Sequence, residues 1–123
     1  GLELLRVAIE EQKGGGTTLA VCMADIDKFK AINDRFGHQV GDQVLRKVTA
    51  TIVGSLRSED LVCRYGGDEF LLAIQDTSCE RLSEIVKRVA QRVGEAPVRT
   101  RSGDVPVTLS IGVALSGCGS NET

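Results

Sequence analysis

Residues 61–74 read LVCRYGGDEFLLAI, in which two apolar runs flank the short Gly-Gly-Asp stretch at 66–68. Runs of this length and composition are typical of strands, and glycine permits the positive φ that a tight turn between strands requires. The stretch therefore predicts a β-hairpin with strands over 61–65 and 69–74 and an acidic tip.

Apolar periodicity predicts further elements on either side of this hairpin. Helices are expected over 2–12, over 28–36 with Gly37 as its C-cap, from about Asp42 to Leu56, and over 82–93; strands are expected over 18–24, 98–101 and 105–115. The last two strands are expected to pair through a turn at 102–104. This order predicts an α+β fold, a ferredoxin-like two-layer sandwich with its helices packed on a mainly antiparallel sheet.

Composition limits the classes of protein that the chain can represent. Its 123 residues suit one domain, 41% of them are hydrophobic, and the formal net charge is -2. This balance lacks the basic footprint of a protein that binds a nucleic acid polymer. No apolar run approaches the roughly 20 residues that span a bilayer. The chain starts at Gly1 without an initiator methionine, so we expect it to be part of a longer protein.

Four cysteines occur, at 22, 63, 79 and 118, and none of them forms a CxxC pair or lies near His38, the single histidine. This spacing argues against a structural zinc site. We therefore expect a reduced, cytoplasmic protein, although the parent protein could still be membrane-anchored.

Acidic residues gather at two places that the predicted fold brings together. Asp25 and Asp27 close the first strand, and Asp68 and Glu69 lie at the hairpin tip. Clustered carboxylate oxygens suit Mg²⁺, which proteins hold by one or two carboxylates together with substrate phosphates. The alternative is that acidic residues occupy turns simply because turns are solvated.

Three further patterns stand out: RYGGDEF at 64–70, DIDKFKAINDRFGHQVGD at 25–42 and VTLSIGVAL at 107–115. Together these stretches resemble the GGDEF family, the catalytic domains of diguanylate cyclases. The resemblance covers nearly the whole chain, as a single domain over 1–123, and implies a βαββαβ core like the palm of nucleotide cyclases and polymerases. It implies condensation of two GTP into cyclic di-GMP and two pyrophosphates. A homodimer would be needed for catalysis, and a regulatory sensor domain is expected in the parent protein.

The same resemblance implies roles for the acidic residues. Asp25, Glu69 and the backbone carbonyl of Ile26 match the ligands of a catalytic Mg²⁺ or Mn²⁺. Asp68 matches a position that either assists deprotonation of the GTP 3′-hydroxyl or contacts the metal.

Contacts with the phosphates are implied for two further segments. Gly66 and Gly67 would let the backbone of the turn approach the nucleotide without a Cβ in the way. The backbone at Lys28 and Phe29 would reach the phosphates, and Lys30 offers a nearby cation.

Asn33 and Asp42 match the residues that bind guanine. A carboxylate can accept hydrogen bonds from the N1–H and N2–H groups of guanine, and adenine lacks this pair of donors. Taken without the family, the two residues have simpler explanations, because Asn33 could end a helix and Asp42 could be an N-cap.

A product-inhibition site is implied by the RxxD sequence from Arg57 to Asp60, which stands at the family's distance before the hairpin, and by Arg88 on the following helix. Guanidinium groups can bind phosphate or a guanine edge through paired hydrogen bonds. The alternative is that Arg57 and Asp60 form an exposed ion pair of little energetic value.

The chain departs from the family pattern at both ends. It lacks the initial DxLTxLxNR segment and the C-terminal helix, whose Lys and Arg bind GTP phosphates in the family. We therefore expect residues 1–123 alone to be folded, largely monomeric and nearly inactive. Two rival functions are a non-catalytic receptor of GTP or cyclic di-GMP and a cyclase that makes a mixed dinucleotide. The intact acidic residues argue against the first, and Asp42 argues against the second.

Overall fold

In a computed structural model of the chain, residues 19–75 and 77–115 are described, except for the side chains of the last two. The elements, in chain order, are β1 (Leu19–Ile26), α2 (Phe29–Phe36), α3 (His38–Ser55), β2 (Leu61–Arg64), β3 (Glu69–Gln75), α4 (Cys79–Glu95), β4 (Val98–Thr100), β5 (Gly103–Val105) and β6 (Leu109–Leu115). The helix expected over 2–12 lies outside the described residues.

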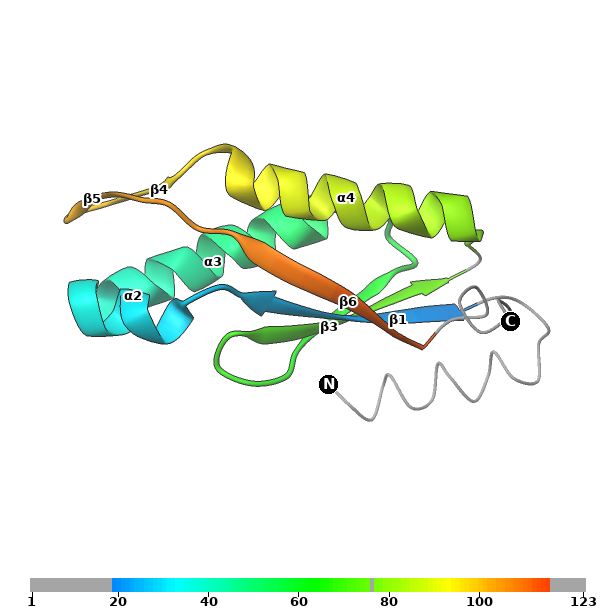
Figure 1. Cartoon of the computed structure of the whole chain (residues 1–123), viewed down its shortest axis with the longest axis horizontal. Helices are drawn as coiled ribbons and strands as arrows, with labels where there is room; N and C mark the ends of the chain where they lie inside the picture. The colour runs from blue at the N-terminus through cyan, green and yellow to red at the C-terminus, as the bar shows by residue number, and fades with distance from the viewer. Residues whose placement is uncertain (1–18, 76, 116–123) are drawn as a thin grey trace.

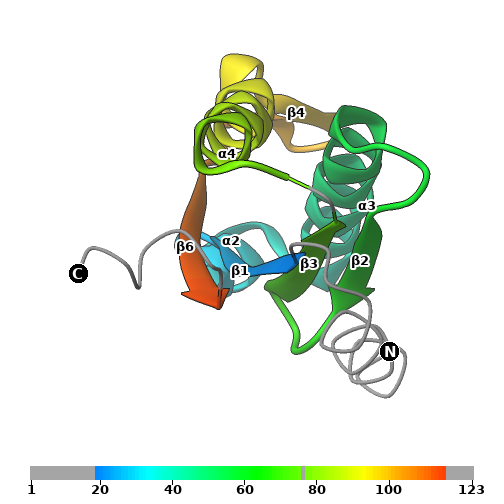
Figure 2. The same cartoon turned by 90° about the vertical axis from the view of Figure 1, so that its right-hand side faces the viewer.

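Four of these strands form the main sheet, in the order β2-β3-β1-β6, and each neighbouring pair is antiparallel. The helices α3 and α4 lie beside each other across one face of this sheet, and α2 lies at the end of β1 (Figures 1 and 2). The predicted α+β sandwich is therefore confirmed, with the predicted hairpin as β2 and β3.

The core lies between the sheet and the two long helices. Alternate residues of β1 and β3 point to this side, so their small and branched side chains meet the apolar faces of α3 and α4. Buried members of this core include Ala20, Cys22, Ala24, Phe70, Leu72, Ile74, Val44, Val48, Ile52, Leu82, Ile85 and Val89. Burial of each larger side chain stabilises the fold by about 1.5–3 kcal/mol before entropy is counted. The intervening residues of both strands, Asp25 and Glu69 among them, point to the opposite face.

The helix α3 begins earlier than predicted. Gly37 is the C-cap of α2, where its N–H donates to the carbonyl of Asn33 at 2.8 Å, and it also serves as the N-cap of α3. Its φ of 96° turns the chain at once into the second helix, a conformation that favours glycine. Asp42 therefore lies within the second turn of α3, and the alternative that it is an N-cap is wrong.

The segment after α4 also differs from the prediction. β4 and β5 form a separate two-stranded sheet, with Thr100 opposite Gly103, so the turn is at Arg101 and Ser102. The pairing of the segment at 98–101 with the start of the next strand is confirmed, but one continuous strand over 105–115 is not. Pro106, which has no N–H to donate, follows β5, and β6 begins only at Leu109.

The hairpin turn uses its glycines differently from the prediction. Among the described residues only Lys28, Gly37 and Gly103 have positive φ, so Gly66 and Gly67 do not. The turn closes through the N–H of Tyr65, which donates to the carbonyl of Glu69 at 2.8 Å.

Two of the cysteines are free thiols, the buried Cys22 and the partly exposed Cys63. Cys79 is disulfide-bonded, which departs from the prediction of a fully reduced chain. In the described part of the chain, no helix combines the length and apolar character needed to cross a bilayer.

Candidate active site

Three carboxylates meet where the end of β1 lies beside the tip of the hairpin. Asp25 stands directly opposite Glu69 in the ladder between β1 and β3, and Asp68 is the residue before β3. Oxygens of the three side chains lie within 4.8 Å of one another. The N–H of Ile26 donates to the carbonyl of Asp68 at 3.0 Å and ties the hairpin tip to the strand end. The predicted apposition of strand-end and hairpin carboxylates is therefore confirmed for these three.

The cluster concentrates negative charge. Desolvation raises the pKa of Asp25, and the neighbouring charges of Asp68 and Glu69 raise it further. A divalent cation would relieve this repulsion, and clustered hard oxygen ligands suit Mg²⁺ or Mn²⁺. The residues present thus fit the metal that the sequence implies.

Gly66 keeps space open beside this cluster. A Cβ built on Gly66 would lie 3.3 Å from Oε1 of Glu69, so a larger residue would press on that carboxylate. A Cβ on Gly67 would meet no atom within 4 Å, which leaves the turn accessible on that side.

Asp27 does not join the cluster, contrary to the prediction of four gathered carboxylates. Its carboxylate accepts hydrogen bonds from the hydroxyls of Thr108 and Ser110, both at 2.6 Å. Both hydrogen bonds lower the pKa of Asp27, and the one from Ser110 has the larger effect. The N–H of Asp27 also donates to the carbonyl of Thr108 at 3.0 Å. Asp27 therefore anchors the end of β1 to the beginning of β6.

This anchored end leads into an unusual turn. Lys28 has φ 58° and ψ 33°, the left-handed conformation that costs a residue with a Cβ about 1–2 kcal/mol. Phe29 begins α2 with its ring buried in the core, while Lys28 and Lys30 are exposed. Strained backbone of this kind is typical of ligand-binding turns. The turn presents two exposed lysines beside the strand end that carries Asp25.

Asn33 and Asp42 come from two different helices, α2 and α3. A Cβ on Gly41 would lie 1.8 Å from Oδ1 of Asn33, so the Asn33 side chain rests against the backbone of α3, one residue before Asp42. At the end of α2, the backbone carbonyl of Asn33 accepts the N–H of Gly37. The alternative that Asn33 ends a helix therefore concerns its backbone and not its side chain.

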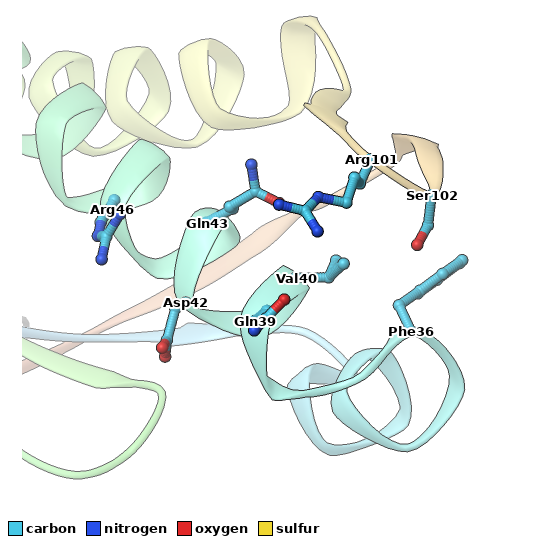
Figure 3. A pocket seen from close by; sticks show the side chains of 8 residues that line it. All are labelled: Phe36, Gln39, Val40, Asp42, Gln43, Arg46, Arg101 and Ser102. Atoms are coloured by element: carbon cyan, nitrogen blue, oxygen red, sulfur yellow. The ribbon is translucent and has the colours of Figure 1, made fainter.

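Asp42 also borders a cavity of about 350 Å³ between α2, α3 and the turn that joins β4 to β5. Its wall consists of Phe36, Gln39, Val40, Asp42, Gln43, Arg46, Arg101 and Ser102. In Figure 3, Gln43 and Arg101 extend toward each other, while Asp42 points away from both. Asp42 is exposed, so its carboxylate is available to a ligand.

The residues predicted for product inhibition line one cavity of about 180 Å³. Arg57 and Asp60 come from the loop between α3 and β2, and Arg88 comes from α4. The N–H groups of Arg57 and Gln75 donate to the Asp60 carboxylate at 2.9 and 3.3 Å, and the Arg57 guanidinium donates to it at 3.3 Å.

The Asp60 side chain is completely buried. The alternative of an exposed ion pair is therefore wrong. Arg88 reaches over the same cavity and donates to the carbonyl of Ser55 at 3.0 Å.

Sequence reasoning missed several residues of these sites. Thr108 and Ser110, which hold Asp27, carried only a weak signal, two hydroxyl side chains at alternate positions near a strand start. Glu84 and Arg81, about one and two turns before Arg88 on α4, also line the smaller cavity. Their helical spacing relative to Arg88 could have suggested them.

The chain is similar in sequence to a known protein family and to several curated proteins. Residues 2–123 match the protein family described as diguanylate cyclase, GGDEF domain. Diguanylate cyclase DosC of Escherichia coli K12 is 42% identical over 101 residues, 81% of this chain and 22% of that protein. Response regulator PleD of Caulobacter vibrioides is 39% identical over 104 residues, 83% of this chain and 23% of that protein. The chain therefore spans less than a quarter of the length of these relatives.

Solved structures agree with this fold. Diguanylate cyclase SiaD from Pseudomonas aeruginosa, solved in complex with its activator SiaC, has a TM-score of 0.84 and 37% identity over 91% of this chain and 43% of that one. The GGDEF domain of DgcB from Caulobacter crescentus, in complex with c-di-GMP, has a TM-score of 0.83 and 32% identity, covering 90% of this chain and 67% of that one.

Proposed function

This chain belongs to the GGDEF family of diguanylate cyclase domains, and on that premise we propose that, in the protein that carries it, the domain condenses two GTP into cyclic di-GMP with release of two pyrophosphates. The observation that supports the proposal most directly is the meeting of Asp25, Asp68 and Glu69 at one edge of the sheet. Like charges held close together are unfavourable, and a domain that only binds nucleotide does not require them. The three intact carboxylates therefore favour an enzyme over a non-catalytic receptor.

In this proposal Asp25, Glu69 and the carbonyl of Ile26 hold Mg²⁺ or Mn²⁺. The metal would neutralise the triphosphate and favour the attacking 3′-hydroxylate. Asp68 either accepts the proton of the 3′-hydroxyl or adds a ligand to the metal. The new bond joins that 3′-oxygen to the α-phosphorus of the second GTP, and pyrophosphate leaves from it.

Each domain supplies one nucleotide, so two copies must face each other as a homodimer. Catalysis then consists mainly of positioning and charge stabilisation.

The nucleotide would lie along the turn after β1. The backbone N–H groups near Lys28 and Phe29 point to the phosphates in this proposal, with Lys30 as a nearby cation, because the start of a helix favours anions. Asp42 and Asn33 would bind the guanine edge, one through a charged acceptor and the other through an amide.

We further propose that cyclic di-GMP binds the cavity of Arg57, Asp60 and Arg88 and inhibits the enzyme. Two arginines at one cavity suit a ligand with two phosphates and two purines. Asp60 would act indirectly, because its carboxylate already holds the backbone and guanidinium of Arg57. The domain would work in the cytoplasm, where GTP is available, under the control of a sensor domain in the parent protein.

Substitution of Glu69 by Gln tests the proposed activity, since it keeps the shape of the side chain and removes a charge from the metal site. The protein that carries this domain is incubated with GTP, ATP and Mg²⁺, and the nucleotide products are separated and identified. We expect cyclic di-GMP from the wild type and none from Glu69→Gln, with unchanged circular dichroism.

Glu95→Gln is the matched control, because Glu95 is exposed at the end of α4. Wild-type turnover in Glu69→Gln contradicts the metal assignment. Binding of cyclic di-GMP without any synthesis by the wild type favours the receptor alternative.

A further inference from the structure

Gly41 is in contact with Asn33 in a way that only glycine permits. It is buried in the first turns of α3, where this helix packs against α2. A Cβ at this position would lie 1.8 Å from Oδ1 and 2.9 Å from Cγ of Asn33. Of the glycines that the structure describes, no other would bring a Cβ closer than 3.3 Å to any such atom. The Asn33 carboxamide thus occupies the volume in which any other side chain at 41 would begin.

Neither backbone conformation nor helix propensity explains this glycine. Positive φ occurs in the described chain at Lys28, Gly37 and Gly103, and not at Gly41. Inside a helix, glycine is about 0.5–1 kcal/mol less favourable than alanine. Gly54, in the same helix, lies in open space, with no atom within 4 Å of a built Cβ. The close approach to Asn33 is therefore the structural use of Gly41.

The backbone of Asn33 is held in place, whereas its side chain can still move. The carbonyl of Asn33 accepts the N–H of Gly37, whose carbonyl in turn accepts the N–H of Gly41 at 3.1 Å. Ile32, the residue before Asn33, is buried in the core and holds α2 in place. A methyl group at position 41 would thus displace the amide of Asn33 more readily than the helix that carries it.

We propose that Gly41 is a specificity-positioning residue, which holds the Asn33 amide against α3 so that it acts together with Asp42 on the base. This inference rests on the proposed function, in which these two side chains bind guanine. Gly41 has no side chain to offer a ligand, and in this proposal it acts through Asn33 by coupling the two helices that supply the base-binding groups. A site built on hydrogen bonds discriminates by their geometry, so displacement of one partner weakens binding of the correct base above all.

The test is a double-mutant cycle of Gly41→Ala and Asn33→Ala in the protein that carries this domain, with Gly54→Ala as the matched control on the same helix. The measurements are kcat and KM for GTP, inhibition of the reaction by ATP, and the melting temperature of each variant. We expect Gly41→Ala to raise the KM for GTP by about tenfold or more and to lower the preference for GTP over ATP, with a smaller change in kcat. Gly54→Ala should leave the KM for GTP and the preference for GTP over ATP unchanged.

The double variant separates positioning from simple packing. If Gly41 acts through Asn33, the double variant has the KM of Asn33→Ala alone, and its melting temperature exceeds that of Gly41→Ala because the clash has been removed. The inference is overturned if the KM of the double variant rises by the product of the two single effects, or if Gly41→Ala keeps the wild-type preference for GTP. It is also overturned if the double variant fails to fold. Failure of the proposed function is seen separately, as absence of cyclic di-GMP from the wild type, while the melting temperatures still report the contact.

Discussion

Replacement of Asp60 by Ala should disrupt both the fold and the proposed inhibitory cavity. The carboxylate of Asp60 is fully buried and accepts the N–H groups of Arg57 and Gln75 together with the Arg57 guanidinium. It joins the loop after α3 to the last residue of β3. Alanine would leave these donors without their acceptor, although the guanidinium, which also donates to the carbonyl of Gln75, keeps one partner.

The size of the effect follows from those bonds. A buried donor that loses its partner costs about 1–3 kcal/mol, and two backbone donors are affected here. Water that enters the adjoining cavity of about 180 Å³ would recover part of this loss. We therefore expect Asp60→Ala to lower the free energy of unfolding by about 2–4 kcal/mol, or the melting temperature by roughly 6–20 °C.

The assay combines thermal unfolding with calorimetric titration of cyclic di-GMP. Asp60→Asn is the control, because its amide oxygen still accepts one or two of the bonds, and its loss should be about half as large. Both variants should bind cyclic di-GMP more weakly, since Arg57 is no longer held in place. A melting temperature within about 2 °C of the wild type would refute the anchoring role. Unchanged affinity for cyclic di-GMP would refute the coupling of Asp60 to the ligand.

Two further experiments test other parts of the site. Asp42→Ser should reduce discrimination between GTP and ATP by about tenfold or more, because guanine loses a charged acceptor. The measurement is competition between the two nucleotides in the synthesis assay. An unchanged preference for GTP would show that Asp42 is only a surface residue of α3. The pair Thr108→Val and Ser110→Ala should lower the free energy of unfolding by about 1–3 kcal/mol, measured by urea denaturation, because Asp27 loses both hydroxyl donors at an exposed position. Thr51→Val, at a partly exposed position on α3, is the control, because it also removes a hydroxyl group. Equal stability of the wild type, this control and the double variant would show that the Asp27 anchor is weak.

Much of the fold could be predicted because its signals are local. The hairpin of β2 and β3 shows as two short apolar runs around a polar turn, and α4 shows as a single apolar face. Boundaries were less certain. The prediction of α3 from Asp42 was wrong because the sequence offered an acidic N-cap there, while Gly37 ends one helix and begins the next within a single residue.

The sequence predicted that Asp25 meets Asp68 and Glu69, but the meeting also depends on which strands pair in the sheet. A strand end and a hairpin tip fall at one edge once the first strand pairs with the second strand of the hairpin, and the two-residue period then puts Asp25 and Glu69 on the same face. The hydroxyl partners of Asp27, the bond from Gln75 to Asp60 and the contact of Gly41 with Asn33 could not be predicted in this way. Thr108 and Ser110 stand more than 80 positions after Asp27 along the chain, so only the pairing of β6 with β1 brings them together. Asp60 is bonded to Gln75 because the loop after α3 lies against the end of β3, and Gly41 meets Asn33 because α2 and α3 pack against each other. Each of these contacts depends on how elements pack in space, and no periodicity within one element encodes it.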